Sequence, residues 1–172
     1  FVYEGFGFKT ESLIERWTRK SDFLDAGSNG GTILDSETLR ELIALDRDVF
    51  NANRSKLIEM LIANSCAGPV VKRTEDRVMS AYALSRRGSK ADYIGPFVSQ
   101  ETNQVGPLLD SLLAQMTGRS LYFDFNTSCI SDSAILLERG FNKERELIRM
   151  QYGEPSASTS SFVIAIAGPE VG

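Results

Sequence analysis

A strand that is interrupted near its middle and leads at once into an amphipathic helix constrains the fold of this 172-residue chain most strongly. The interruption is Gly95-Pro96 within the apolar run 93–98, where proline cannot donate a hydrogen bond to a strand ladder. The helix that follows is predicted by apolar residues at i, i+3, i+4, i+7, i+8 and i+11: Val105, Leu108, Leu109, Leu112, Leu113 and Met116. Pro107 suits a first helical turn, and Gly118 is a typical helix stop. We therefore expect a bulge or an interrupted ladder immediately before the most regular helix of the chain.

The patterns on either side predict further helices and strands in mixed order. Asp35 or Ser36 caps a first helix, and Asn53 caps a second. Leu121, Phe123 and Phe125 alternate with polar residues, which indicates a strand with Tyr122, Asp124 and Asn126 on its other face. In order, the expected elements are two helices, three strands, a helix, a strand, a short helix and two strands. Their approximate positions are 36–50, 54–62, 70–71, 78–85, 93–98, 105–116, 121–126, 132–139, 144–151 and 162–167.

The N-terminal segment is predicted to be separate from the rest. A glycine-rich turn at 1–8 precedes a half-buried strand around 13–17, and AGSNGG at 26–31 has the composition of a flexible linker. The chain begins at Phe1, which favours a processed or cut fragment. A strand with one apolar face needs a sheet, so we expect 13–17 to pair with the remaining sheet or with a neighbouring molecule.

The absence of histidine excludes more classes of function than any other feature of the composition. Without it there is no Ser-His-Asp or Cys-His nucleophile and no zinc site with His ligands, and Cys66 and Cys129 cannot form a Cys₄ site. Two lone thiols fit a reducing, cytoplasmic compartment. A net charge of −4 argues against a broad nucleic-acid surface, and no apolar run is long enough to span a membrane. We expect neither a bound metal nor nucleic-acid or membrane partners.

The predicted order of elements, with an interrupted strand before a helix N-terminus, resembles the GNAT superfamily of acyl-CoA-dependent N-acyltransferases. The resemblance covers about residues 34–172. Within the superfamily, the sequence is similar to the subgroup related to holothin acyltransferase. The segments that carry it are 81–86 (AYALSR), 91–98 (ADYIGPFV), Gly140-Phe141, Arg145, Arg149-Met150, Gly153 and 168–170 (GPE). It implies an α+β fold: a central mixed, twisted sheet with helices on both faces and a splayed pair of strands.

A second copy of a family pattern lies near the chain's start. Many members of the superfamily carry Y-E-x-x-G-F before their sixth strand, and Tyr3-Glu4-Gly5-Phe6-Gly7-Phe8 resembles it, as Gly140-Phe141 does later. The resemblance implies that 1–25 is the tail of a preceding GNAT-like domain, 26–31 a linker and 32–172 a GNAT-like acyltransferase domain. The alternative is an ordinary glycine turn before a strand.

The resemblance also implies where acyl-CoA would bind. Its pantetheine would pair with one splayed strand, and its pyrophosphate would sit at the N-terminus of the next helix. The residues so implied are Phe97, Val98, Ser99, Asn103, Gln104, Val105, Gly106 and Asn126. The usual loop, R/Q-x-x-G-x-G/A, is matched only at Gly106: Asn103 replaces Arg or Gln, Leu108 replaces the small residue, and Pro107 removes an N–H. The alternative is an ordinary capped helix packed on the sheet.

The resemblance leaves the catalytic groups open. Asp124 is the best candidate for the base that takes a proton from the amine, and Tyr93 and Glu101 are further candidates. Leu136 occupies the position at which the family often has a Tyr that acts as the general acid. Leucine cannot donate a proton, so Leu136 is assigned to the core. Cys129 is either a thiol with a lowered pKa near a helix N-terminus or an inert buried residue. Arg145 and Arg149 share a strand face, where they either meet an acidic substrate or form surface ion pairs.

These observations predict acyl transfer, acetyl transfer first of all, from acetyl-CoA as co-substrate to a small-molecule or peptide amine by direct attack. The alternative is a non-catalytic GNAT-like module that completes, dimerises or regulates an active partner, either a preceding GNAT domain or a second chain. A binding domain for another nucleotide-like ligand is a remoter alternative.

Overall fold

The computed structural model describes residues 2–21, 34–129, 133–153 and 160–169. The predicted linker at 26–31 lies outside these residues, as does Glu170. The described elements are η1 (Glu4–Phe6), β1 (Phe8–Arg19), α1 (Ser36–Phe50), α2 (Ser55–Ala63), β2 (Val70–Arg73), β3 (Met79–Arg86), β4 (Asp92–Ser99), α3 (Thr102–Gln115), β5 (Leu121–Asn126), α4 (Ala134–Leu137), β6 (Asn142–Tyr152), η2 (Ser160–Phe162) and β7 (Val163–Ile166). From α1 onward the order of helices and strands is the predicted one.

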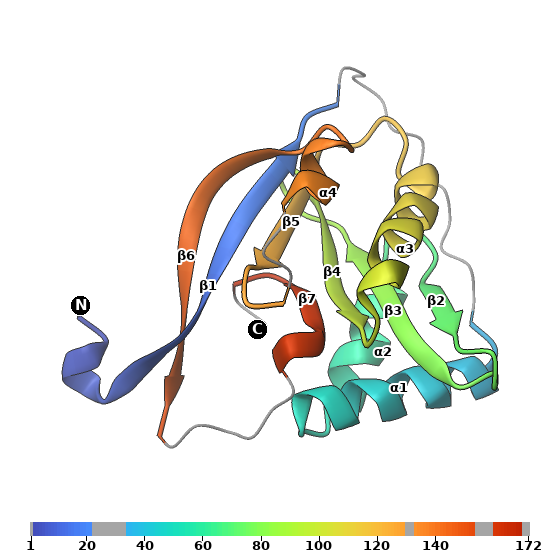
Figure 1. Ribbon diagram of the computed structural model, residues 1–172, viewed down its shortest axis with the longest axis horizontal. Helices are drawn as coiled ribbons and strands as arrows, with labels where there is room; N and C mark the ends of the chain where they lie inside the picture. Colours follow the sequence, from blue (N-terminus) through green and yellow to red (C-terminus); the bar gives the residue numbers. More distant parts are fainter. Residues whose placement is uncertain (1, 22–33, 130–132, 154–159, 170–172) are drawn as a thin grey trace.

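All seven described strands form one sheet, in the order β2-β3-β4-β7-β5-β1-β6 (Figure 1). Neighbours in this order are antiparallel, and β4 and β5 make an additional, parallel pairing. A mixed sheet with helices confirms the predicted fold class.

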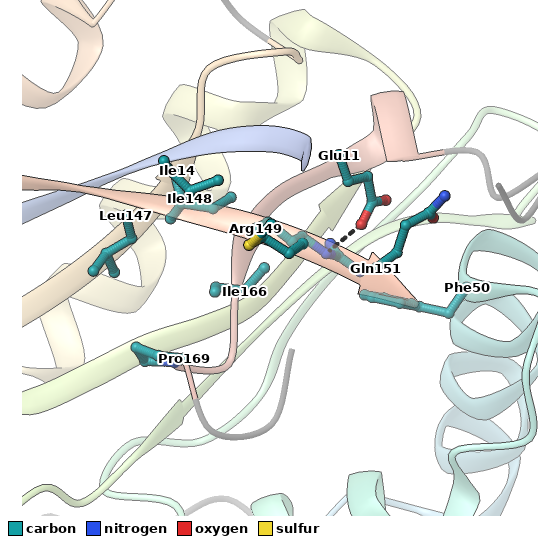
Figure 2. A pocket seen from close by; sticks show the side chains of 10 residues that line it. Glu11, Ile14, Phe50, Leu147, Ile148, Arg149, Gln151, Ile166 and Pro169 are labelled. Carbon is teal, nitrogen blue, oxygen red and sulfur yellow. Dashed lines mark ion pairs between the residues drawn. The ribbon is translucent and has the colours of Figure 1, made fainter. Parts of the chain in front are cut away.

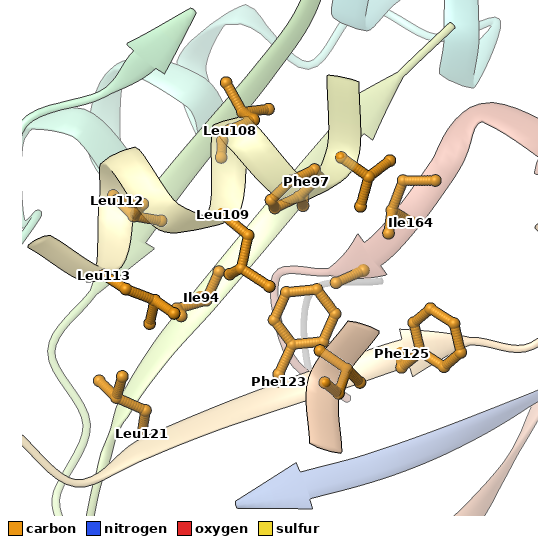
Figure 3. Packing of buried hydrophobic residues seen from close by; sticks show 14 of the residues in the cluster. Ile94, Phe97, Leu108, Leu109, Leu112, Leu113, Leu121, Phe123, Phe125 and Ile164 are labelled. Carbon is orange, nitrogen blue, oxygen red and sulfur yellow. The ribbon is translucent and has the colours of Figure 1, made fainter. Parts of the chain in front are cut away.

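Helices cover both faces of the sheet, and each face has its own apolar cluster. On one face, α3 and α4 pack with the odd-numbered residues of β5 (Figure 3). On the other, α1 and α2 pack against Ile14, Tyr82, Val98 and β7. The alternation of β5 therefore places Leu121, Phe123 and Phe125 under α3 and turns Tyr122, Asp124 and Asn126 to the opposite face. None of the helices in the described part is long and apolar enough to cross a membrane.

The structure corrects the predicted start of α3. The helix begins at Thr102, so Pro107 lies inside it, past the first turn where it was expected. The first turn consists of polar residues, which add nothing to the apolar periodicity, so the pattern alone could not reveal it. Leu108 is fully buried and belongs to the core.

β1 is an integral strand of the sheet. It lies between β5 and β6 and is antiparallel to both, with Arg16 opposite Asp124 on one side and Arg145 on the other. Its Trp17 is buried in the α3-side cluster. The expectation that this segment pairs with the sheet is confirmed. The assignment of 1–25 to the tail of a preceding domain stays a prediction.

Candidate functional site

β4 and β5 run side by side only at their beginnings. Their parallel register joins Asp92 to Leu121, Tyr93 to Tyr122 and Ile94 to Phe123, and ends there. Beyond this point the two strands separate, which is the predicted splay. The interrupting pair Gly95-Pro96 follows Ile94 directly, so the sequence feature that suggested a broken ladder marks the place where the strands part.

The chain's own strand β7 fills the space between the splayed strands. It pairs with β4 through Phe97↔Ala165 and Val98↔Val163, and with β5 through Asp124↔Ile166 and Phe125↔Ala165. The contact is close: a Cβ added to Gly95 would lie 2.1 Å from the carbonyl oxygen of Ile166. Three of the predicted cofactor residues, Phe97, Val98 and Asn126, contact β7, and Asn126 Nδ2 donates to the Val163 carbonyl at 3.1 Å.

The predicted phosphate loop forms the start of α3, where its groups are engaged within the protein. The Oγ of Ser80 and the amide oxygen of Gln104 are hydrogen bonded at 2.9 Å, and the Ser99 hydroxyl donates to the Glu101 carbonyl at 2.7 Å. Val105 and Gly106 are buried. Asn103 lies exposed in the first turn.

A guanidinium stands over Gly106. A Cβ at this position would lie 3.1 Å from Arg139 Nη2. Arg139 is fixed by two hydrogen bonds to the carboxylate of Asp110, at 2.7 and 2.9 Å, and by one to the Ile135 carbonyl. The space beside Gly106, the glycine that matches the family loop, is thus occupied by the Arg139 side chain.

Asp124 is fully buried and held by an arginine. Arg16 donates from Nε to Oδ1 and from Nη2 to Oδ2, both at 2.7 Å. The hydrogen bonds to Asp124 raise the pKa of Arg16 above its ordinary value, so the guanidinium stays charged. Tyr93 lies on the same face, with its ring centroid 5.3 Å from Arg16 Cζ. The structure therefore brings the two predicted catalytic residues together through Arg16, whereas Glu101 lies apart at the N-cap of α3.

Arg16 was not predicted as a site residue. The signal was present, because Arg16 follows Ile14 by two positions on a strand and shares its buried face. Sequence alone did not show that β1 would lie beside β5, and without that neighbour Arg16 has no reason to be buried.

The remaining candidates, Leu136 and Cys129, are packed in or against the apolar cluster on the α3 side of the sheet. Leu136 is 1% exposed, as expected for a core residue. Cys129 Sγ lies 3.0 Å from the Val163 carbonyl oxygen, to which it donates, and burial raises the pKa of this thiol to about 11. The inert reading of Cys129 is the one that the structure favours.

We expect Cys129 to resist thiol reagents in the folded protein. A pKa of about 11 against an ordinary 9.0 lowers the thiolate fraction at pH 8 about 100-fold, and thiolate is the reacting form. Burial raises the pKa of Cys66 as well. Labelling with a disulfide reagent, with and without denaturant, measures the difference. Labelling of folded Cys129 at the rate of free cysteine would contradict the expectation.

Arg149 lines a cavity of about 430 Å³ between β6, β1 and the segment after β7 (Figure 2). Its Nε lies 3.0 Å from Glu11 Oε2, and the apolar walls include Ile14, Leu147 and Ile166. Of the two alternatives for Arg149, ion pairing is the one observed.

Comparison with known proteins identifies the fold's relatives. A family model described as an acetyltransferase (GNAT) domain matches residues 42–163. The uncharacterized N-acetyltransferase YitH of Bacillus subtilis (strain 168) is 24% identical over 176 residues, which cover 99% of this chain and 61% of that protein. The chain thus spans less than two thirds of this curated relative.

Two solved structures share the fold. A putative acetyltransferase from Pyrococcus horikoshii superposes with a TM-score of 0.64 at 16% identity, over 99% of this chain and 56% of its own. A GCN5-related N-acetyltransferase from Sphaerobacter thermophilus gives a TM-score of 0.61 at 10% identity, over 92% of this chain and 57% of its own.

Proposed function

Because the chain belongs to the GNAT acetyltransferase family, we propose that it serves the transfer of an acyl group, acetyl first of all, from acyl-CoA to a primary amine by direct attack. The observation that supports this is the splay of β4 and β5 beside the N-terminus of α3, which is where the resemblance places acyl-CoA. Direct attack requires no nucleophile of the protein, which suits a chain without histidine.

The residues around the splay do not fit acyl-CoA while β7 is in place. The pantetheine would need the backbone of Phe97 and Val98, and β7 already pairs with both residues. At the start of α3, Val105 and Gly106 are buried and so present no open backbone surface to a pyrophosphate. Asp124 is likewise closed to an amine in this state, because its carboxylate is fully buried and accepts two hydrogen bonds from Arg16.

These contacts favour a second candidate for what the described domain does in acyl transfer. In it, the domain is a GNAT-like module that completes, dimerises or regulates an active partner, either a preceding GNAT domain or a second chain. The filled gap is the observation that supports it, and Leu136 at the position of the family's acidic Tyr agrees with it. The tandem arrangement and the holothin acyltransferase-like subgroup belong to the same proposal and rest on the sequence motifs.

Acetyl-CoA is expected to leave the thermal stability of this chain nearly unchanged. A ligand present at 100 times its Kd adds about 2.7 kcal/mol, which raises the melting temperature of a domain of this size by several degrees. With β7 in the gap, we expect a shift below about 1 °C at millimolar acetyl-CoA. Calorimetry with desulfo-CoA as a matched control measures it.

A shift of several degrees would overturn the module role and assign the acyl-CoA site to this domain. Acyl transfer itself is tested separately, by the release of CoA thiol in the presence of primary amines when the chain is combined with its partner. No release with any amine would contradict the activity proposed for the assembly.

A further inference from the structure

A second cavity, of about 220 Å³, lies beside the paired beginnings of β4 and β5. It is distinct from the gap that β7 fills. Its walls come from β1, β4, β5, β6 and the turn before β4. The lining residues used below are Arg16, Lys90, Tyr93, Tyr122, Glu144 and Arg145.

A β-bulge in β6 builds one wall of this cavity. Arg16 pairs with Arg145, but the next residue of β1, Trp17, pairs with Lys143, so Glu144 is the extra residue. Successive residues of a regular strand point to opposite faces, yet Glu144 and Arg145 both line the cavity. Bulges re-aim side chains in this way and are frequent next to functional sites.

The cavity carries an excess of positive charge, although the whole chain is acidic. Arg16 and Arg145 stand opposite each other on paired strands, an arrangement of like charges that is unfavourable by itself. The carboxylate of Asp124 balances the positive charge of Arg16 through their ion pair. Among the described residues, Arg145 and Lys90 have no ion-pair partner. Three cationic groups thus face Glu144 and the buried Asp124, which leaves an excess of one positive charge.

Two tyrosines hold Arg16 in place at the wall. Its Cζ lies 4.7 Å from the Tyr122 ring centroid and 5.3 Å from that of Tyr93, and Arg86 Cζ stacks 4.0 Å from the Tyr93 ring. Arg16 is almost fully buried, so its position is fixed by packing as well as by Asp124. The two Asp124 bonds use Nε and Nη2, which leaves Nη1 able to donate elsewhere.

We propose that this cavity binds a small oxyanion, the carboxylate or phosphate group of a ligand. The groups that line it include a guanidinium fixed by packing, a second guanidinium, an ammonium and two tyrosines, while Glu144 supplies the only lining carboxylate among the described residues. An oxyanion supplies the acceptor oxygens and the charge that such a donor set lacks. The site does not depend on the proposed function, because it lies outside the gap between the splayed strands.

The test titrates the intact chain with inorganic phosphate, with acetate and with the neutral isostere acetamide, and follows the arginine Nε–H signals by NMR. We expect phosphate or acetate to shift the Arg16 and Arg145 signals saturably, and acetamide to shift neither. Arg145→Gln, on an exposed part of the edge strand, is expected to weaken binding about tenfold or more, the effect of one charge-assisted hydrogen bond. Arg47→Gln makes the same charge change at an exposed position of α1 and is the matched control.

The proposal is overturned if neither anion shifts these signals, if acetamide binds as well as acetate, or if Arg145→Gln and Arg47→Gln weaken binding equally. Lys90→Gln, in the turn before β4, provides a second variant in case Arg145→Gln perturbs β6. The ratio of phosphate to acetate affinity tells which oxyanion the cavity prefers. Titration with acetyl-CoA is a separate measurement, so failure of the proposed function and failure of this site are distinguishable.

Discussion

Asp124→Asn is expected to destabilise the folded chain by about 3–5 kcal/mol, because it leaves the Arg16 guanidinium buried without its counter-charge. Both side chains are nearly inaccessible, with 7% and 0% exposed, so solvent cannot replace the lost partner. Urea unfolding followed by circular dichroism measures the change. Asp110→Asn is the matched control: it removes the carboxylate of a similar bidentate pair, but Asp110 is 57% exposed, and we expect a loss below about 1 kcal/mol.

A double variant separates the charge effect from a packing effect. Replacing the pair by apolar residues of similar volume, Arg16→Met with Asp124→Leu, is expected to recover most of the stability, since no buried charge remains. Equal losses in the single and double variants would show that shape, and not the ion pair, makes this site sensitive. If Asp124→Asn unfolds like the wild-type chain, the buried pair does not contribute as described.

Gly95→Ala is expected to cost about 3 kcal/mol and to loosen β7 selectively. The added Cβ would lie 2.1 Å from the Ile166 carbonyl oxygen, which belongs to the backbone and cannot rotate away. The φ of Gly95, +151°, is also one that L side chains rarely adopt. Amide hydrogen exchange should therefore accelerate at residues 163–166 more than in β2 and β3.

Gly5→Ala is the matched control for that prediction. Nothing lies within 4 Å of a Cβ at Gly5, so we expect the free energy of unfolding of Gly5→Ala to stay within about 0.5 kcal/mol of that of the wild-type chain. Unchanged exchange at 163–166 in Gly95→Ala would mean that β7 does not depend on the close approach of Gly95. The same variant offers a test of the filled gap, because a loosened β7 should leave more of β4 open to acyl-CoA.

The order of helices and strands could be predicted because each element carries a local signal. The apolar spacing from Val105 to Met116 defines α3, and the alternation of Leu121, Phe123 and Phe125 defines β5 and its buried face. Asp35 is the expected cap of α1 and accepts from the backbone N–H groups of Glu37 and Thr38. The bounds were less predictable: β1 runs from Phe8 to Arg19, beyond the five residues expected, because backbone pairing with β6 continues through polar residues.

The contents of the candidate site could not be predicted in the same way. The apolar run that forms β7 indicates a buried strand, but nothing in Val163–Ile166 says which strands it will lie between. Similarly, Arg16 and Asp124 are 108 positions apart, and only the assembled sheet makes them neighbours. Pairing partners are chosen by the whole sheet, so a site that depends on them is not encoded in any one segment.

The position of β1 also bears on how the molecule assembles. This strand is made before α1 and the rest of the sheet, yet its partners are residues 121–126 and 142–152. Closing a loop of more than a hundred residues carries a large entropic cost, and chains dominated by such distant contacts fold slowly. Within this chain, both partner strands of residues 8–19 are synthesised about a hundred residues or more after them. Ile14 and Trp17, which the finished sheet buries on its two opposite faces, therefore depend for their burial on the parts of this chain that are made last.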